Sequence, residues 1–286
     1  MHGEQTTIRF TKMTGSGNDF VLIDNRDNGY SVEWNALAPK ICDRRYGVGA
    51  DGILVLEKSS AADIRMNYFN ADGSYGGMCG NGGRCTASYL MESSRTSSLT
   101  IEVLDHIYSA SGNSSLVTLF MKDPAGIQTG IELPLRTGTI VVQFVNTGSP
   151  HVVIFRDELP EQFREALEKD GIERLGREIR QHPRFEPEGA NVNFVTSIDA
   201  SRIAVRTYER GVEGETMACG TGAVASAVMA SLLRANAPPV FVIPRSGDSL
   251  TVRFLRSGDS FSDVSLEGGV RRVFSGEYAW PPEKGA

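Results

Sequence analysis

Hydrophobic positions along the chain fall into many short runs separated by glycine, asparagine, aspartate or proline. Runs such as 53–56, 116–120 and 203–208 are rich in β-branched and aromatic residues, a composition typical of strands. They follow one another too closely for crossover helices to be the general rule, so the pattern favours antiparallel pairing. Helical patterns cover about residues 34–45, 82–92, 159–180 and 221–235. The pattern as a whole predicts an α+β protein.

Two pairs of segments repeat about half the chain apart. Cys79-Gly80-Asn81-Gly82 and Cys219-Gly220-Thr221-Gly222 are each followed by a helical pattern. Thr14-Gly15-Ser16 and Thr147-Gly148-Ser149 each precede an apolar, strand-like run, at nearly the same separation. Two features that recur in the same order predict an internal duplication.

The duplication predicts two pseudo-symmetric halves, each a curled, mostly antiparallel, barrel-like sheet around one central helix. The helix at 221–235 is apolar around nearly its whole circumference, which is typical of a buried helix. We place the seam near Asp123-Pro124. The N-terminal half is expected to contain residues 1–123 and a C-terminal strand at about 271–286, and the C-terminal half residues 124–270.

Charge and composition limit the classes of partner. The 286 residues include 29 Lys and Arg against 35 Asp and Glu, a formal net charge of −6, and no basic run is longer than Arg44-Arg45 or Arg271-Arg272. Nucleic acids and anionic membrane surfaces require clustered positive charge, so we expect neither as a partner. The chain has no apolar stretch of about 20 residues and no signal-peptide pattern, and we expect it to be cytoplasmic.

The four cysteines divide into two kinds. Cys42 and Cys85 lie in helical segments, where a cysteine is most often a packing residue. Cys79 and Cys219 each precede a predicted helix, whose first N–H groups and dipole stabilise an anion. Such a position favours the thiolate, because it lowers the pKa of a cysteine from about 8.5 into the range of about 3.5–7.5.

One such thiol from each half predicts a cleft in which two thiols face a substrate from opposite sides. That geometry suits a two-base reaction, in which one thiolate removes a proton and the opposite thiol returns one on the other face. The result is inversion at carbon.

Six segments, in the same order, resemble the diaminopimelate epimerase family over essentially the whole chain. They are Gly17-Asn18-Asp19-Phe20, Gly47-Val48-Gly49-Ala50-Asp51-Gly52, Asn70-Ala71-Asp72-Gly73-Ser74, Met78-Cys79-Gly80-Asn81-Gly82, Asn191-Val192-Asn193-Phe194, and Glu209-Arg210-Gly211 leading to Ala218-Cys219-Gly220-Thr221-Gly222. The resemblance implies a diaminopimelate epimerase-like fold, a homodimer and a small-molecule substrate. It also implies cofactor-independent epimerisation of L,L- and meso-diaminopimelate, in lysine and peptidoglycan-precursor synthesis.

The resemblance also implies a role for each matching residue. Cys79 and Cys219 would be the acid–base pair at the α-carbon. The reacting α-carboxylate would be held through helix-terminal N–H groups; these belong to Gly80, Asn81, Gly220 and Thr221. The amino groups and the distal carboxylate would be contacted by Asn18, Asn70, Asn191, Glu209 and Arg210. His151 and Glu209 would tune the thiols, since a neighbouring charge shifts a thiol pKa.

The chain departs from the family pattern at two places that bear on the site. It has Gly148-Ser149-Pro150-His151 where the family commonly has Gly-Asn-Pro-His, so a hydroxyl replaces an amide. The usual Glu-Arg-Gly-x-Gly-Glu-Thr contains one extra residue here, within 211–216, which predicts a longer loop after Glu209 and Arg210.

Cofactor sites fit the sequence poorly. The segment 47–52 matches the dinucleotide string Gly-x-Gly-x-x-Gly, but a strand-like run follows it and a helical segment precedes it, the reverse of the order that phosphate binding needs. Pyridoxal phosphate requires a Schiff-base lysine, and none of the six lysines lies in the Cys-Gly motifs. No Cys-x-x-Cys or His-x-x-x-His pair suggests zinc. We therefore expect no cofactor and no metal.

Four other functions are weighed against the epimerase. Proline racemase-like enzymes pair two cysteines, but their first motif resembles Cys-Gly-His-Gly, where this chain has Asn81. Phenazine-biosynthesis isomerase-like proteins share the architecture and lack the thiol pair. A peptidase or transferase dyad of Cys79 and His151 leaves Cys219 unexplained. A thiol redox sensor that closes a Cys79–Cys219 disulfide stays an alternative.

Overall fold

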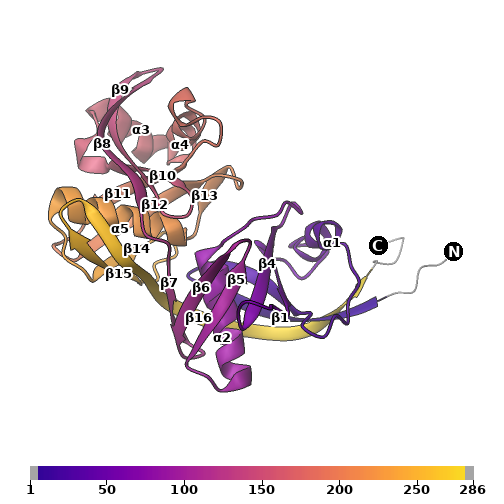
Figure 1. Cartoon of the computed structure of the whole chain (residues 1–286). Coiled ribbons are helices and arrows are strands. Elements are labelled where there is room, and N and C mark those ends of the chain that lie inside the picture. Colours follow the sequence, from indigo (N-terminus) through magenta and orange to yellow (C-terminus); the bar gives the residue numbers. More distant parts are fainter. Residues whose placement is uncertain (1–5, 281–286) are drawn as a thin grey trace. The chain divides into compact units, whose positions relative to one another are not determined.

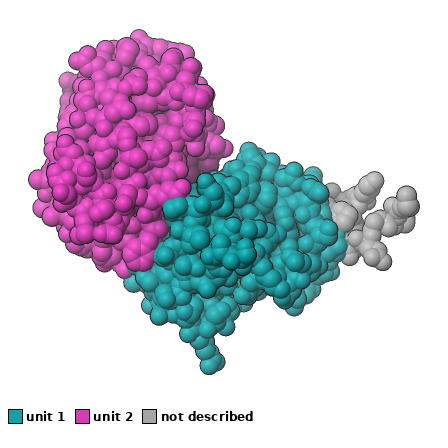
Figure 2. Space-filling view, viewed as in Figure 1, with its two compact units in different colours: residues 1–119, 269–286 teal, residues 120–268 magenta. Residues whose placement is uncertain are grey.

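Residues 6–280 are described by a computed structural model (Figure 1), and they form two compact units. Unit 1 combines residues up to Leu119 with those from Gly269 onward, and unit 2 contains Phe120–Gly268 (Figure 2). The predicted C-terminal strand at about 271–286 is a strand as far as Trp280, and its last six residues lie outside the described part.

Unit 1 is a closed barrel of eight strands. Its strands are β1 (Thr6–Gly15), β2 (Asn18–Asp24), β3 (Gly52–Glu57), β4 (Ile64–Asn70), β5 (Ser98–Val103), β6 (His106–Gly112), β7 (Leu116–Phe120) and the last part of β16 (Ser260–Trp280). They are ordered β1 to β7 and then β16, which pairs back onto β1. The parallel pairs are β2–β3 and β4–β5, and the crossovers between them carry the helices α1 (Trp34–Ile41) and α2 (Gly80–Ser94).

Unit 2 repeats this arrangement. Its strands are β8 (Ala125–Leu135), β9 (Gly138–Asn146), β10 (Pro150–Phe155), β11 (Asn191–Ser197), β12 (Arg202–Glu209), β14 (Val240–Ile243), β15 (Leu250–Ser257) and the first part of β16, with the short β13 (Gly214–Thr216) beside β12. The parallel pairs are β10–β11 and β12–β14. The crossovers carry α3 (Glu161–Asp170) and α4 (Glu173–Arg180) in the first case and α5 (Gly220–Arg234) in the second. Two 3-10 turns, Arg156–Glu158 and Pro183–Phe185, flank α3 and α4.

The same central helix occurs in both units. Helix α2 contacts β1 to β6, and α5 contacts the six equivalent strands β9 to β12, β14 and β15, so each helix is enclosed by its own sheet. Parallel and antiparallel pairs also alternate in the same order in the two units. The prediction of two pseudo-symmetric halves, each curled around one helix, is confirmed.

The predicted helices differ from the observed ones mainly at their ends. The pattern at 159–180 is two helices rather than one, because Gly171 after α3 adopts a φ of 68° that a continuous helix does not allow. Helix α1 stops at Ile41, and α2 begins at Gly80, directly after Cys79.

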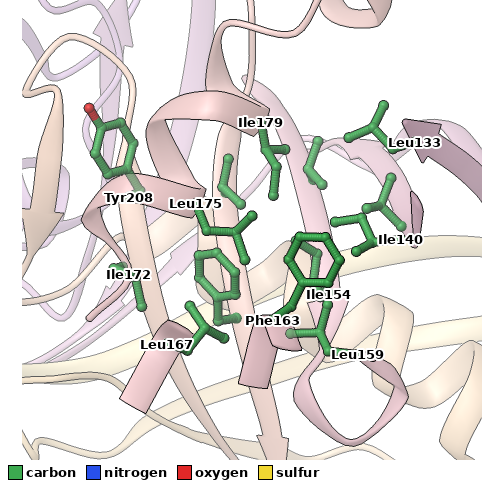
Figure 3. Packing of buried hydrophobic residues seen from close by; sticks show 14 of the residues in the cluster. Leu133, Ile140, Ile154, Leu159, Phe163, Leu167, Ile172, Leu175, Ile179 and Tyr208 are labelled. Carbon is green, nitrogen blue, oxygen red and sulfur yellow. The ribbon is translucent and has the colours of Figure 1, made fainter. Parts of the chain in front are cut away.

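Strand alternation gives the sheet of unit 2 two buried faces, one packed against α3 and α4 and the other facing α5. Val152 and Ile154 of β10 and Val192 of β11 belong to one core cluster with Phe163 and Leu167 of α3, and Phe163 lies beside Ile154 (Figure 3). The intervening positions point to the opposite face, toward α5. The polar residues at these positions are His151, Asn191, Asn193, Thr207 and Glu209.

Among the helices over residues 6–280, none is long and apolar enough to cross a membrane.

Candidate active site

Cys79 and Cys219 occupy equivalent positions in the two units. Each is the N-cap residue of its central helix, with φ and ψ of −119° and 116° at Cys79 and −120° and 113° at Cys219. The sulfur of Cys79 accepts a hydrogen bond from the Gly82 N–H at 3.4 Å. Both thiols therefore lie at the end of a helix where N–H groups and the dipole favour negative charge.

At the third residue of each helix, a side chain would displace a neighbouring side chain. A Cβ at Gly82 would lie 2.9 Å from Leu54 Cδ2 and 3.6 Å from the sulfur of Cys79. A Cβ at Gly222 would lie 2.4 Å from Asn193 Oδ1 and 3.3 Å from the sulfur of Cys219. The two glycines thus allow the helix to begin against the sulfur and against the strands.

In unit 1, hydrogen bonds join two predicted residues, Asn18 and Asn81, at the start of α2. Asn81 is 1% exposed, and its amide nitrogen donates to Asn18 Oδ1 at 2.5 Å. Asn18 in turn donates to Asp51 Oδ2 at 2.9 Å. Asn70 lies at the end of β4 beside this group, since the N–H of the next residue donates to the Asp51 carbonyl, but its side chain bonds Ser74 at 3.0 Å.

A fully buried arginine supports the same group of residues at the start of α2. Arg84 is 0% exposed, and its Nη2 donates to Asn81 Oδ1 at 2.6 Å and to Ser16 Oγ at 3.0 Å. Its Nη1 donates to the Gly269 carbonyl at 3.4 Å. The guanidinium therefore fixes the orientation of the Asn81 amide.

An ionic network holds the loop that carries Asp51. Asp19 accepts from Lys12 at 2.7 Å and from Arg44 at 2.8 Å, and Arg44 also donates to Asp51 at 2.7 Å. Burial raises the pKa of Asp19, but the hydrogen bonds from Arg44 and Lys12 outweigh it and hold that pKa below its ordinary value. The carboxylate thus stays charged at neutral pH.

In unit 2, four polar side chains meet at the start of α5. Ser149 Oγ lies 2.9 Å from His151 Nε2 and 3.3 Å from Thr221 Oγ1, and it accepts from Asn191 Nδ2 at 3.3 Å. Thr221 Oγ1 lies 3.5 Å from the sulfur of Cys219. The predicted residues Cys219, Thr221, His151 and Asn191 are therefore joined through Ser149.

His151 is buried, with its side chain held on both nitrogens. Burial, together with the nearby charge of Arg210, lowers its pKa to about 3. The imidazole is therefore neutral at pH 7. A neutral ring can act on a thiol only through its hydrogen bonds, so the tuning role expected of His151 would be exerted through them.

Glu209 and Arg210 lie where β12 ends. The Arg210 N–H donates to Asn191 Oδ1 at 2.9 Å, and its guanidinium pairs with Glu188 at 3.3 Å. Glu209 is opposite Gly214 in the β12–β13 hairpin, which accommodates the extra residue of this segment. The backbone of Arg210 thus belongs to the group of residues at the start of α5. Its guanidinium instead pairs with the exposed carboxylate of Glu188.

Cys42 and Cys85 are packing residues, as predicted. They are 3% and 0% exposed, and burial raises the pKa of each thiol to about 12. At neutral pH both are protonated and unreactive.

Several supporting residues were not predicted as part of the site. Asp51 stands within a quoted motif and Arg84 two residues after another, and Asn193 is two positions after Asn191 on the same face of β11. The alternation of strand residues was the signal that could have identified Asn193. For residues 6–280, no group of three or more His, Cys, Asp or Glu side chains is arranged to hold a metal ion.

Comparison with known sequences gives a consistent match. A sequence model of the family described as diaminopimelate epimerase matches residues 10–114 and 143–271. The diaminopimelate epimerase of Hydrogenobaculum sp. (strain Y04AAS1) is 39% identical over 284 residues, which cover 93% of this chain and 96% of the relative. That of Archaeoglobus fulgidus is 39% identical over 287 residues, covering 94% and 95%.

Comparison with solved structures gives the fold. A phenazine biosynthesis protein of the PhzF family from Bacillus anthracis has a TM-score of 0.72 at 17% identity, over 96% of this chain and 99% of that one. A probable proline racemase from Agrobacterium radiobacter K84 has a TM-score of 0.70 at 15% identity, over 97% and 94%. At such identities the likeness concerns the architecture alone.

Proposed function

The chain belongs to the diaminopimelate epimerase family and is an amino-acid epimerase, and we propose that it interconverts L,L- and meso-diaminopimelate in lysine and peptidoglycan-precursor synthesis. The observation that carries the proposal is the pair of cysteines at the N-caps of two equivalent central helices. We propose Cys79 and Cys219 as the acid–base pair, with no cofactor.

In the proposed reaction, one cysteine acts as a thiolate and the other as a thiol. The thiolate takes the α-proton, and the electron pair left on the α-carbon spreads into the carboxylate. The thiol then gives its proton to the opposite face of that carbon, so the first sulfur ends protonated and the second ends as a thiolate. The reverse direction exchanges the two roles, and reduced thiols are required in both, a condition that the cytoplasm provides.

The α-carboxylate is proposed to bind the first N–H groups of the central helices. These are the groups of Gly80, Asn81, Gly220 and Thr221. Support comes from the N-cap geometry, which leaves first-turn N–H groups to interact with an anion. Negative charge that develops on the carboxylate is stabilised by the same donors, so they act more strongly in the transition state than in the ground state.

The remaining polar residues are proposed to bind the rest of the substrate. Carboxylate and amide oxygens suit ammonium groups, and a guanidinium suits a carboxylate. The proposed residues are Asn18, Asn70, Asn191, Glu209 and Arg210. Arg210 would have to exchange its Glu188 partner for the distal carboxylate, which is feasible because 65% of the Glu188 side chain is exposed.

The test is an isotope-exchange assay on the reduced protein in deuterium oxide, with no pyridoxal phosphate added. L,L- and meso-diaminopimelate are supplied separately, and deuterium at the α-carbon and the isomer ratio are measured by NMR. We expect deuterium in the product of inversion from either isomer. Absence of both exchange and inversion with fully reduced protein would overturn the proposal.

We also propose that the protein is a homodimer formed through β16 of unit 1. Residues 271–275 are exposed at consecutive positions, so both faces of this strand are open, and Val273 and Phe274 are large apolar side chains. The adjoining groove, of about 790 Å³, is lined by charges of both signs. A twofold interface brings a patch against its own copy, so mixed charge around an apolar centre suits a second copy of this chain.

A further inference from the structure

A chain of hydrogen bonds connects the buried imidazole of His151 to the sulfur of Cys219. It runs from His151 to Ser149 at 2.9 Å, from Ser149 to Thr221 at 3.3 Å, and from Thr221 Oγ1 to the sulfur at 3.5 Å. All four residues belong to unit 2. Whether the sulfur accepts a hydrogen bond from Thr221 depends on which group donates in each of these bonds. The neighbouring residues determine the donors.

The direction of the first bond is fixed by Asn193. Its Nδ2 donates to the Val152 carbonyl at 3.0 Å, and its Oδ1 accepts from Thr207 Oγ1 at 3.0 Å, so the amide cannot be reversed. The same Nδ2 lies 3.1 Å from His151 Nδ1, which must therefore accept. The proton of the neutral imidazole is then on Nε2, and it is donated to Ser149 Oγ.

The direction of the second bond is fixed by Asn191. Its Oδ1 accepts from the Arg210 N–H at 2.9 Å and its Nδ2 donates to the Pro150 carbonyl at 3.1 Å, so this amide is oriented too. Nδ2 also donates to Ser149 Oγ at 3.3 Å. Ser149 thus accepts from Asn191 and from His151, which occupies both of its lone pairs. Its own hydrogen is left for Thr221.

We propose that Ser149 is a positioning residue that turns the hydroxyl hydrogen of Thr221 toward the sulfur of Cys219. Thr221 Oγ1 accepts from Ser149, and its hydrogen is then directed to the sulfur. A hydroxyl that donates stabilises a thiolate more than a thiol, because hydrogen bonds to an ionised acceptor are the stronger ones. The importance of this for catalysis rests on the proposed function, whereas the hydrogen-bond directions do not.

The repeat gives a control inside the same molecule. Ser16, the counterpart of Ser149, accepts from Arg84 Nη2, and Asn81, the counterpart of Thr221, donates to Asn18. Cys79 therefore has an amide where Cys219 has the threonine hydroxyl. Loss of the Ser149 hydroxyl is expected to change the environment of Cys219 and to leave that of Cys79 as it is.

The experiment measures alkylation of the two cysteines by iodoacetamide at pH 7, with peptide mass spectrometry to follow both in one sample. We expect Ser149→Ala to slow alkylation of Cys219 about three- to tenfold, since the thiolate loses an oriented donor, and to leave Cys79 unchanged. Ser149→Thr, which keeps the hydroxyl, is expected to keep the wild-type rate. A structural role alone would not be rescued by this conservative variant.

A double-mutant cycle tests whether Ser149 acts through Thr221. Thr221→Val is expected to slow alkylation of Cys219 as much as Ser149→Ala does, and Ser149→Ala is expected to add nothing in the Thr221→Val background. Thr221→Ser keeps the hydroxyl and is expected to keep the wild-type rate, so slowing in Thr221→Val can be assigned to loss of the hydroxyl.

Three results would overturn the inference: additive effects of the two substitutions, equal slowing at Cys79 and Cys219, or no change at Cys219. Alkylation requires no turnover of diaminopimelate. If the variants change alkylation as expected but the wild type shows no isotope exchange, only the proposed function is rejected. If the wild type exchanges deuterium but Ser149→Ala leaves alkylation of Cys219 unchanged, only the inference is rejected.

Discussion

Cys79 and Cys219 share one backbone conformation, but different groups surround them. Near Cys79 a buried guanidinium, that of Arg84, orients the amide of Asn81. Near Cys219 a buried neutral imidazole, that of His151, begins the hydrogen-bond chain. The two units share the position of the thiol and differ in the groups that support it, so the two cysteines are not expected to respond alike to substitution of their neighbours.

Replacement of either proposed acid–base cysteine is expected to stop epimerisation. Cys79→Ser and Cys219→Ser should each lower kcat at least about a hundredfold, because a serine hydroxyl is too weak an acid to replace a thiol at pH 7. Inversion is followed by circular dichroism or NMR. The control is Cys42→Ala, which removes a buried thiol that the proposed reaction does not use and should keep activity per folded molecule. If only one of the serine variants were inactive, a single-nucleophile mechanism would be favoured.

Asp19 is expected to make stability depend on pH. Its folded-state pKa is lowered, so its contribution is present above the unfolded pKa of about 3.9 and is lost as the pH falls through the folded value. Asp19→Asn should lower the free energy of unfolding by about 1–3 kcal/mol at pH 7, since Lys12 loses its carboxylate partner.

Urea unfolding at a series of pH values tests this prediction. The difference between wild type and Asp19→Asn should diminish below about pH 4, and Asp105→Asn, at an exposed carboxylate, serves as the control. A difference that stays constant down to pH 2 would contradict the assignment.

At the scale of elements, the start of each central helix depends on close approach between glycine and a strand. In unit 2, Gly222 lies against Asn193 and against the sulfur of Cys219. Gly222→Ala should destabilise the protein by about 1–3 kcal/mol and lower kcat at least about tenfold, because the added methyl displaces the amide that orients His151. Gly29→Ala is the matched control, since a Cβ there meets no atom within 4 Å.

Urea midpoints and kcat are measured for both glycine variants. Wild-type stability and activity in Gly222→Ala would show that the helix start tolerates a side chain, and would contradict the packing described.

The sequence allowed the elements and their repeat to be predicted, and local signals explain why. Short β-branched runs, the apolar helix at 221–235 and the repeated Cys-Gly segments are patterns within a few residues of one another. The contacts among site residues are not local: the side chains of His151 and Asn193 meet across the parallel pair β10–β11. Such a contact depends on strand register and on burial, neither of which can be read from the two segments separately.

Neutral His151 illustrates the same point at the site. Its predicted role, to tune a thiol, assumed a charge on the imidazole. Complete burial among amide and hydroxyl partners excludes that charge, and burial is a property of the folded unit. Ser149 was noted only as a departure from the family pattern, and its role became visible once its neighbours were known.

At the scale of the whole molecule, the proposed dimer gives a direct prediction. Phe274→Glu places a charge in the centre of the exposed β16 patch and should raise the dimer dissociation constant at least about tenfold. Size-exclusion chromatography with light scattering should show two chains for the wild type and one for the variant at low concentration. Leu255→Glu, at another exposed apolar position, is the control and should remain dimeric. A monomeric wild type would contradict the proposal.

Strand β16 also has a consequence for synthesis of the chain. Its last residues pair with β1, with Trp280 opposite Thr6, so a strand synthesised before unit 2 is joined by one synthesised after it. Unit 2 is continuous, from Phe120 to Gly268, and can complete its fold earlier. The usual order, in which the N-terminal part folds first, is therefore reversed here. Nascent unit 1 must wait with β1 unpaired on that side until residues 270–280 are synthesised, and termination before Val270 would leave its barrel unclosed.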